Sequence, residues 1–99
     1  MYREKNQLRI YEFAQLPHQN TLTFHTYEVL LRMNQNVADR IKELRLKINL
    51  SQEGLSHLAN LDRKYIGIIE KGNTNVSIQV LYQICDALDI SLSDFFKEF

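Results

Sequence analysis

The sequence predicts an all-α domain of five short helices, preceded by an N-terminal extension with strand character. Two observations carry this prediction: apolar residues recur at three- and four-residue steps over residues 36–99, and helix-capping residues punctuate that pattern. The 99-residue chain also holds only three Gly and one Pro, which argues against a sandwich of tight turns. We therefore divide the chain into an extension, residues 1–35, and a helical domain, residues 36–99.

The first predicted helix runs from Val37 to about Lys47, and Asn36 can cap it. Its apolar stripe consists of residues three or four apart, namely Val37, Ile41, Leu44 and Ile48. The stretch "SQEG" indicates the start of a second helix, with Ser51 as N-cap and Gln52 in the first turn.

The second helix is expected to bury Leu55, Leu58 and Ala59. Gly54 lies inside this helix, where it costs about 1 kcal/mol relative to Ala. Asn60 follows the last helical residue, at a position where a left-handed conformation is usual.

The third predicted helix has Asp62 as N-cap, continues to Lys71 and is ended by Gly72. Ile66 and Ile69 give it a narrow apolar face. The first turn of this helix is therefore free to point outward.

Two cations and a phenol, Arg63, Lys64 and Tyr65, occupy that first turn. A helix that only fills a core would favour carboxylates there, because the N-terminal end of a helix carries partial positive charge. We infer that something negative approaches this turn from outside.

Ser77 caps a fourth predicted helix, whose broad apolar stripe comprises Ile78, Leu81, Ile84, Cys85 and Leu88. Ser91 or Ser93 caps a short last helix. Large apolar area near the end of the chain comes from Phe95, Phe96 and Phe99.

The extension reads differently from the helical domain. The stretches "LRIYEF" and "TLTFHTYEV" alternate in part, and "QLPHQN" lies between them, which favours a β-hairpin with strand character before about Tyr27. A rival interpretation places Tyr27, Leu30, Leu31 and Val37 at a helical spacing that merges with the first helix. A leader without fixed structure is the third alternative.

The net charge is zero, but the charges are unevenly distributed. Residues 40–71 carry seven cations and four anions, whereas residues 72–99 carry one cation and four anions. Such a separation can steer an anionic partner to one face of the protein. An ordinary mixed surface explains the same counts.

Several function classes find no support in the composition. Cys85 is the only cysteine and lies on an apolar stripe, which indicates a core residue in a reducing compartment. The three histidines have no zinc-site spacing, and neither a Gly-rich phosphate loop nor a serine elbow occurs. We expect no catalytic site, no metal and no cofactor. Without a long apolar run or a signal peptide, we expect a cytoplasmic protein and no membrane partner.

The segments around "SQEGLSHLANLDRKYIGIIEKG" form two short helices joined by a turn, which is the helix-turn-helix pattern. With "RIKELR" before it and "LYQICDALDISLSDFF" after it, this string resembles the Xre/Cro/C1 family of bacterial and phage repressors over residues 36–99. The resemblance implies a lambda-repressor-like fold of five helices. Within the family, "NLDRKYIGIIEKGNTNVSI" is most similar to controller proteins of restriction–modification systems, which are small dimeric regulators.

The resemblance also implies a DNA-binding site. Arg63, Lys64 and Tyr65 match the positions that read base edges in the major groove, and the fork of Arg63 suits guanine O6 and N7. Gln52 matches the position that reaches a phosphate. Further contacts to the DNA backbone are implied for Gly67, Lys71, Asn73, Thr74, Asn75 and Ser77.

Each assignment has a structural alternative. Arg63 and Lys64 can form a solvated helix surface, and Tyr65 can pack against the first helix. Gln52 can be simply a good first-turn residue, and the Asn-rich loop can be ordinary turn chemistry.

The sequence departs from the family pattern at Asn60, where many members have Gly, at Ile68, and in a loop without the Pro that is common before the fourth helix. Ile68 can contact a sugar or a methyl group, or it can be buried. Glu70 is interpreted as structural, in a pair with Arg40 or Arg45.

A regulator of this family is implied to dimerise on a palindromic operator in double-stranded DNA, with half-sites about 34 Å apart. Bound there, it blocks RNA polymerase or contacts and activates it, and controller proteins act at their own promoter. Ile90, Phe96 and Phe99 are candidates for the two-fold interface. Two alternatives stay open: an antitoxin whose N-terminal segment binds a toxin, and a protein-interaction module without DNA binding.

Overall fold

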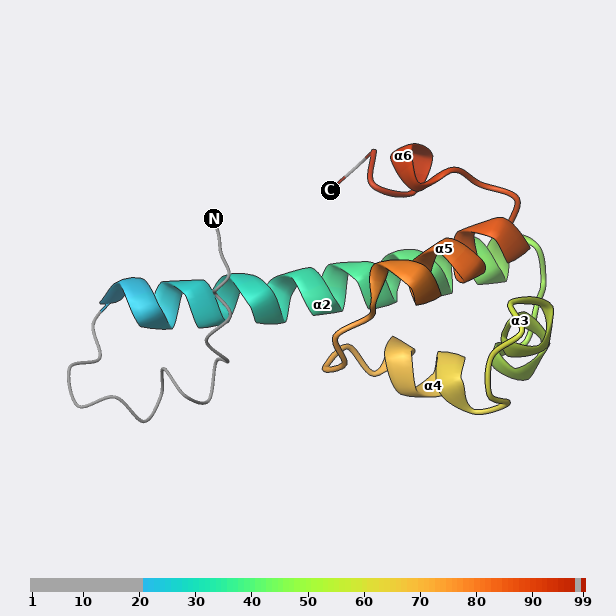
Figure 1. Ribbon diagram of the computed structural model, residues 1–99, viewed down its shortest axis with the longest axis horizontal. Helices are drawn as coiled ribbons and strands as arrows, with labels where there is room; N and C mark the ends of the chain where they lie inside the picture. The colour runs from blue at the N-terminus through green and yellow to red at the C-terminus, as the bar shows by residue number, and fades with distance from the viewer. Residues whose placement is uncertain (1–20, 98) are drawn as a thin grey trace. The chain divides into compact units, whose positions relative to one another are not determined.

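The computed structural model describes residues 21–97 and 99, and in this part of the chain it contains five helices and no strand (Figure 1). The helices are α2 (Thr21–Lys47), α3 (Gln52–Leu58), α4 (Tyr65–Glu70), α5 (Ile78–Ala87) and α6 (Leu92–Phe95). The chain divides into two units, residues 1–32 and residues 33–99. The second unit contains α3 to α6 and the C-terminal part of α2, and therefore the whole helix-turn-helix region.

Among the described residues, the second strand of the predicted N-terminal hairpin is absent. Thr21–Lys47 is helical, so the strand expected in "TLTFHTYEV" is wrong, and Asn36 lies within α2 rather than at its cap. "LRIYEF" lies outside the described residues. A short apolar run fits both the strand period and the helix period, and here Tyr27, Leu30 and Leu31 follow the helical spacing of the rival interpretation.

Serine caps begin three of the helices. The hydroxyl oxygens accept hydrogen bonds from backbone N–H groups three residues on: Ser51 from Gly54 at 2.9 Å, Ser77 from Val80 at 3.1 Å, and Ser91 from Asp94 at 3.0 Å. The third bond selects Ser91 over Ser93 as the cap of α6. A Cβ on Gly54 would lie 3.0 Å from the Ser51 hydroxyl oxygen, so this glycine leaves room for the cap.

The turn between α3 and α4 has the predicted left-handed residue, since Asn60 has a φ of 59°. However, α4 begins at Tyr65, later than expected, and Arg63 and Lys64 lie in the turn before it. The Asp62 carboxylate accepts a hydrogen bond from the Lys64 N–H at 3.1 Å, so Asp62 caps this turn instead of the helix. Gly72, with a φ of 90°, follows α4 as predicted.

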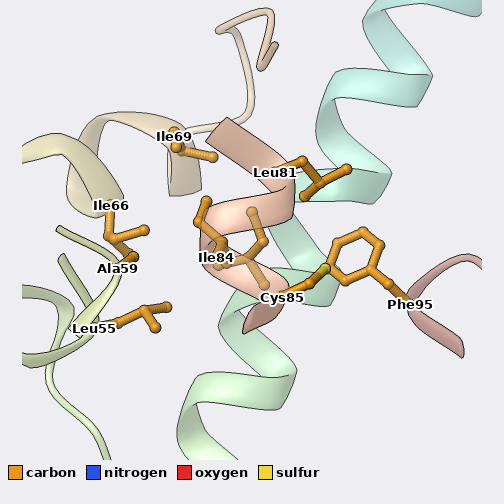
Figure 2. Close-up of a cluster of buried hydrophobic side chains, with 9 residues drawn as sticks. Leu55, Ala59, Ile66, Ile69, Leu81, Ile84, Cys85 and Phe95 are labelled. Atoms are coloured by element: carbon orange, nitrogen blue, oxygen red, sulfur yellow. The ribbon is translucent and has the colours of Figure 1, made fainter. Parts of the chain in front are cut away.

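The core of the second unit lies where α2, α3, α4, α5 and α6 meet (Figure 2). Phe95 of α6 is fully buried there. The nine buried side chains are those of Ile41, Leu55, Ala59, Ile66, Ile69, Leu81, Ile84, Cys85 and Phe95. Burial raises the pKa of the Cys85 thiol, although the nearby charge of Arg40 lowers it. The thiol therefore stays protonated, as its interpretation as a core residue requires.

Three residues expected on buried stripes are instead exposed: Ile48, Leu58 and Ile78. Ile48 follows the end of α2, Leu58 is the last residue of α3, and Ile78 is the first residue of α5. Helical spacing continues to such positions, but these three side chains remain open to water. Among the described residues, every helix is too short or too polar to cross a membrane.

Arg40 of α2 holds α6 against the rest of the second unit. Its guanidinium donates hydrogen bonds to the backbone carbonyls of Phe95 at 3.0 Å and Asp94 at 3.1 Å. It also pairs with Glu43 at 3.1 Å. Arg40 is therefore occupied at the C-terminal end of α6 and is not the partner of Glu70.

Replacing Phe95 by Ala should lower the free energy of unfolding by about 3–5 kcal/mol, because the truncation leaves a large cavity in the core. The matched control is Tyr82→Ala, since this side chain is 61% exposed and its loss should change stability by less than about 0.5 kcal/mol. Urea denaturation followed by circular dichroism measures both. Equal effects of the two variants would contradict the placement of α6.

Candidate nucleic-acid interface

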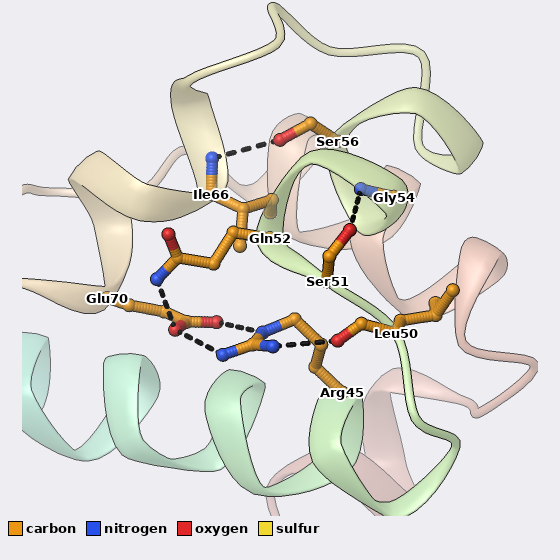
Figure 3. A network of polar contacts seen from close by, with 8 residues as sticks. All are labelled: Arg45, Leu50, Ser51, Gln52, Gly54, Ser56, Ile66 and Glu70. Carbon is orange, nitrogen blue, oxygen red and sulfur yellow. Dashed lines mark hydrogen bonds and ion pairs between the residues drawn. The ribbon is translucent and has the colours of Figure 1, made fainter.

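A buried ion pair joins α2 to α4 (Figure 3). Arg45 donates to both carboxylate oxygens of Glu70, at 2.8 and 3.0 Å, and to the backbone carbonyl of Leu50 at 2.7 Å. The side chains of Arg45 and Glu70 are only 8% and 4% exposed. The hydrogen bonds to Glu70 and the charge of Glu70 raise the pKa of the Arg45 guanidinium, whereas burial lowers it, and the net direction is upward. The structure thus selects Arg45, not Arg40, as the partner of Glu70.

Gln52 extends this pair to the start of α3. Its amide nitrogen donates to Glu70 at 3.0 Å (Figure 3). A Cβ on Gly67 would lie 3.0 Å from the Gln52 amide oxygen, so the glycine leaves room for this side chain. Gln52 is nevertheless exposed, and its side chain is oriented by the protein before any ligand arrives.

Ser56 of α3 supplies a hydrogen-bond acceptor to the first turn of α4. The Ser56 side chain is fully buried, and its hydroxyl oxygen accepts from the Ile66 N–H at 3.2 Å (Figure 3). Lys64, the residue before α4, makes no side-chain cap of its own. A backbone donor at the helix start is therefore satisfied from α3, which fixes the two helices relative to each other.

The Arg45–Glu70 ion pair and Ser56 together form what we call the buried frame. An open depression of about 430 Å³, the α3–α4 hollow, lies beside this frame. Its lining contains four cations and two carboxylates, and Arg45 already neutralises one carboxylate, Glu70. The lining residues are Lys42, Gln52, Glu53, Arg63, Lys64, Gly67, Ile68, Glu70 and Lys71. The hollow thus presents an excess of positive charge to an approaching anion.

Arg63 and Glu53 form the other ion pair of the hollow, at 3.1 Å. The two side chains are 73% and 61% exposed, so water screens their attraction and the pair contributes about 0–1 kcal/mol. Arg63 can therefore leave Glu53 at little cost, unlike Arg45 in its buried pair.

The three residues predicted for base readout share one turn but differ in burial. Arg63 and Lys64 are exposed, whereas Tyr65 is half-buried against the core. The ring of Tyr65 therefore packs against the core. Ile68, left open by the sequence, is 46% exposed and lines the hollow, so its interpretation as a buried residue is wrong.

Gln52 lies at the start of α3 and Gly67 within α4, and the other residues predicted for phosphate contacts follow α4. Lys71 lines the hollow, and Asn73, Asn75 and Ser77 are exposed, whereas Thr74 is half-buried. The Asn75 side-chain oxygen accepts from the Asn34 amide at 2.8 Å. The Ser77 hydroxyl oxygen caps α5, but the hydroxyl hydrogen stays available to donate.

Sequence reasoning missed Lys42, Glu53 and Ser56. Lys42 of α2 and Glu53 of α3 line the hollow, and Ser56 supports α4 from beneath. The available signal for Lys42 is its position three residues before Arg45 on one helix. Ser56 gives no comparable signal, because a buried serine and an exposed one look alike in a helical pattern.

The residues proposed for a two-fold interface lie near the end of the chain. Phe96 and Phe99 are 38% and 52% exposed, and Ile90 is half-buried. The ring centroids of Phe96 and Phe99 are 4.9 Å apart, and that of Phe96 lies 5.0 Å from Phe95. The exposed rings of Phe96 and Phe99 thus form one aromatic cluster with the buried ring of Phe95.

Replacing Arg45 by Gln should lower the free energy of unfolding by about 3–5 kcal/mol, because Glu70 is left buried and unpaired. The control is Arg63→Gln, which removes an exposed pair and should cost less than about 1 kcal/mol. Thermal and urea denaturation measure both variants. A cost below 1 kcal/mol for Arg45→Gln would show that Glu70 is solvated and that the frame is absent.

Replacing Ser56 by Ala should cost about 1–3 kcal/mol, since the buried Ile66 N–H loses its acceptor. The exposed Ser93 provides the matched control, and Ser93→Ala should have little effect. Urea denaturation gives the free energies, and amide exchange at Ile66 should quicken in Ser56→Ala alone. Unchanged exchange at Ile66 would argue against this capping role.

Comparison with known proteins agrees with this geometry. A helix-turn-helix family model matches residues 41–95. The control protein C.MunI of Mycoplasma sp is 41% identical over 61 residues, which are 61% of this chain and 82% of that protein. C.BamHI of Bacillus amyloliquefaciens is 39% identical over 56 residues, which are 56% of this chain and 69% of that protein.

A solved structure gives the same result for the fold. The crystal structure of the restriction-modification controller protein C.AhdI from Aeromonas hydrophila superposes with a TM-score of 0.62 at 38% identity, covering 66% of this chain and 98% of that one. These findings confirm the resemblance predicted from the motifs. The chain therefore belongs to the helix-turn-helix family, of the Xre/Cro/C1 type.

Proposed function

We propose that this protein is a dimeric, sequence-specific regulator of transcription that acts on its own promoter, as a restriction–modification controller protein would. Regulation of transcription by binding DNA is the function of the helix-turn-helix family to which the chain belongs. The observation that carries the proposal is the α3–α4 hollow, where exposed cations surround a turn held from beneath by a buried frame.

In the proposed complex, α4 lies in the major groove with Arg63, Lys64 and Tyr65 toward the base edges. Arg63 leaves its exposed pair with Glu53 and donates to guanine O6 and N7, which discriminates by about 1–3 kcal/mol. Lys64 donates to guanine or to phosphate. Because its ring is half-buried, Tyr65 acts through its hydroxyl or ring edge.

The proposed phosphate contacts surround α4. Gln52 reaches the backbone from α3, and its bond to Glu70 orients it in advance. Gly67 lets the backbone of α4 approach closely. The loop supplies the remaining contacts, from Lys71, Asn73, Thr74, Asn75 and Ser77. These contacts position the protein, and base contacts specify the sequence.

A dimer with two-fold symmetry would read a palindromic operator with half-sites about 34 Å apart. We place the interface at Ile90, Phe96 and Phe99, where exposed aromatic area adjoins the core. At the promoter, in the cytoplasm, the bound dimer blocks RNA polymerase or contacts and activates it. No metal or other cofactor and no catalytic residue has a role in this proposal.

The antitoxin alternative has one observation in its favour. Phe24, Tyr27 and Leu31 of the first unit are 57%, 44% and 42% exposed and follow a helical three- and four-residue spacing. Such a stripe can bind a protein partner. A toxin gene beside this one would favour the antitoxin, whereas a methyltransferase gene would favour the controller.

Footprinting and gel shifts on the DNA upstream of the gene test the proposal. A true operator binder protects two half-sites, keeps its preference over random DNA and loses affinity steeply with salt. Absence of DNA binding at every salt concentration would leave the protein-interaction module as the better description.

Two substitutions separate base readout from positioning. Arg63→Ala should relax the preference at one base pair per half-site by about 1–3 kcal/mol. Gln52→Ala should weaken binding to all sequences alike, because it removes a phosphate contact. Lys47→Ala serves as the control, since this exposed lysine lies outside the lining of the α3–α4 hollow. A uniform loss in both site variants, measured by competition gel shifts, would refute the assignment of Arg63.

A further inference from the structure

We propose that Ile68 contacts the C5-methyl group of a pyrimidine in the major groove. Each half-site then contains one pyrimidine with a C5-methyl group, thymine or 5-methylcytosine, that the protein selects through this contact. The inference rests on the proposed binding of DNA by α4. It adds a specificity residue to the cations and the tyrosine already assigned to base edges.

The placement of Ile68 on α4 is the first support. Ile66 and Ile69 are buried and define the inner face of the helix, whereas Ile68 is 46% exposed. At about 100° per residue, the direction opposite to the inner face falls among Lys64, Ile68 and Lys71. Ile68 thus lies between two lysines on the face that the proposed complex turns toward DNA.

The surroundings of Ile68 are the second support. Gly67 and Ile68 are the apolar residues in the described lining of the α3–α4 hollow, and every other lining residue is charged or an amide. The side chain adds little to the core, which Ile66 and Ile69 already fill. Its apolar surface is therefore available to a ligand that enters the hollow.

The chemistry of the groove limits what this side chain can recognise. Base edges in the major groove present hydrogen-bond donors and acceptors, which an isoleucine leaves unpaired, and the C5-methyl group, which it can cover. Thymine and 5-methylcytosine both carry that methyl group. A contact to a sugar would also be apolar, but it would not depend on the base.

Selection from a pool of random duplexes with the full-length protein identifies the preferred half-site. Each thymine is then replaced by uracil, which removes only the methyl group. We expect one position per half-site where this change weakens binding by about threefold to tenfold. At the same position, cytosine and 5-methylcytosine form a second pair that differs only in the methyl group.

The variant Ile68→Ala should abolish the difference between thymine and uracil while circular dichroism shows an unchanged fold. Ile48→Ala is the matched control, because Ile48 is 50% exposed but lies outside the lining of the hollow, and it should keep the difference. A methyl effect in both pairs supports readout of either base, and an effect in the thymine–uracil pair alone identifies thymine.

Three outcomes overturn the inference. If a preferred sequence is found but every thymine tolerates uracil, or Ile68→Ala keeps the difference, Ile68 does not read a methyl group and the proposed function stands. If no sequence is enriched at all, sequence-specific binding of DNA fails, and the inference fails with it.

Discussion

Arg45 of α2 and Glu70 of α4 form a bidentate ion pair that is almost fully removed from water. Two such charges are stable in the interior only when each is paired and hydrogen-bonded. The third bond of the guanidinium, to Leu50, and the bond from Gln52 to Glu70 complete this requirement. One pair therefore connects the end of α2, the start of α3 and the end of α4.

The two ion pairs of the site differ in how far they are buried. The pair of Arg63 and Glu53 has the same chemistry as that of Arg45 and Glu70, but it is exposed and screened. A buried pair keeps its geometry because breaking it leaves a buried charge unpaired. An exposed pair exchanges partners readily, because water solvates both charges. We propose that Arg45 stays in its buried pair when DNA binds, whereas Arg63 leaves Glu53 and contacts the DNA. Ser56 adds a second, uncharged link between the same helices.

Local chemistry predicted the caps of α3 and α5, Ser51 and Ser77, because a cap is decided within four residues. It was wrong for Asn36, which lies within α2, and for Asp62, which caps the turn before α4. Packing decided what the sequence left open. Arg40 and Arg45 lie five residues apart on one helix, and only the folded chain shows that Glu70 meets Arg45. Residues 21–36 are helical, whereas the sequence favoured strand character before about Tyr27, because a short, partly alternating run fits two periods. The exposure of Ile68 depends on which neighbours cover α4.

Hydrogen–deuterium exchange of the full-length protein, free and saturated with a selected duplex, tests the central claim most directly. That claim is that the turn before α4 and the loop after it meet DNA while the buried frame stays in place. We predict slower exchange over residues 63–77 and at the start of α3. Slowing confined to residues 21–32 or to α6, with residues 63–77 unchanged, would contradict the account.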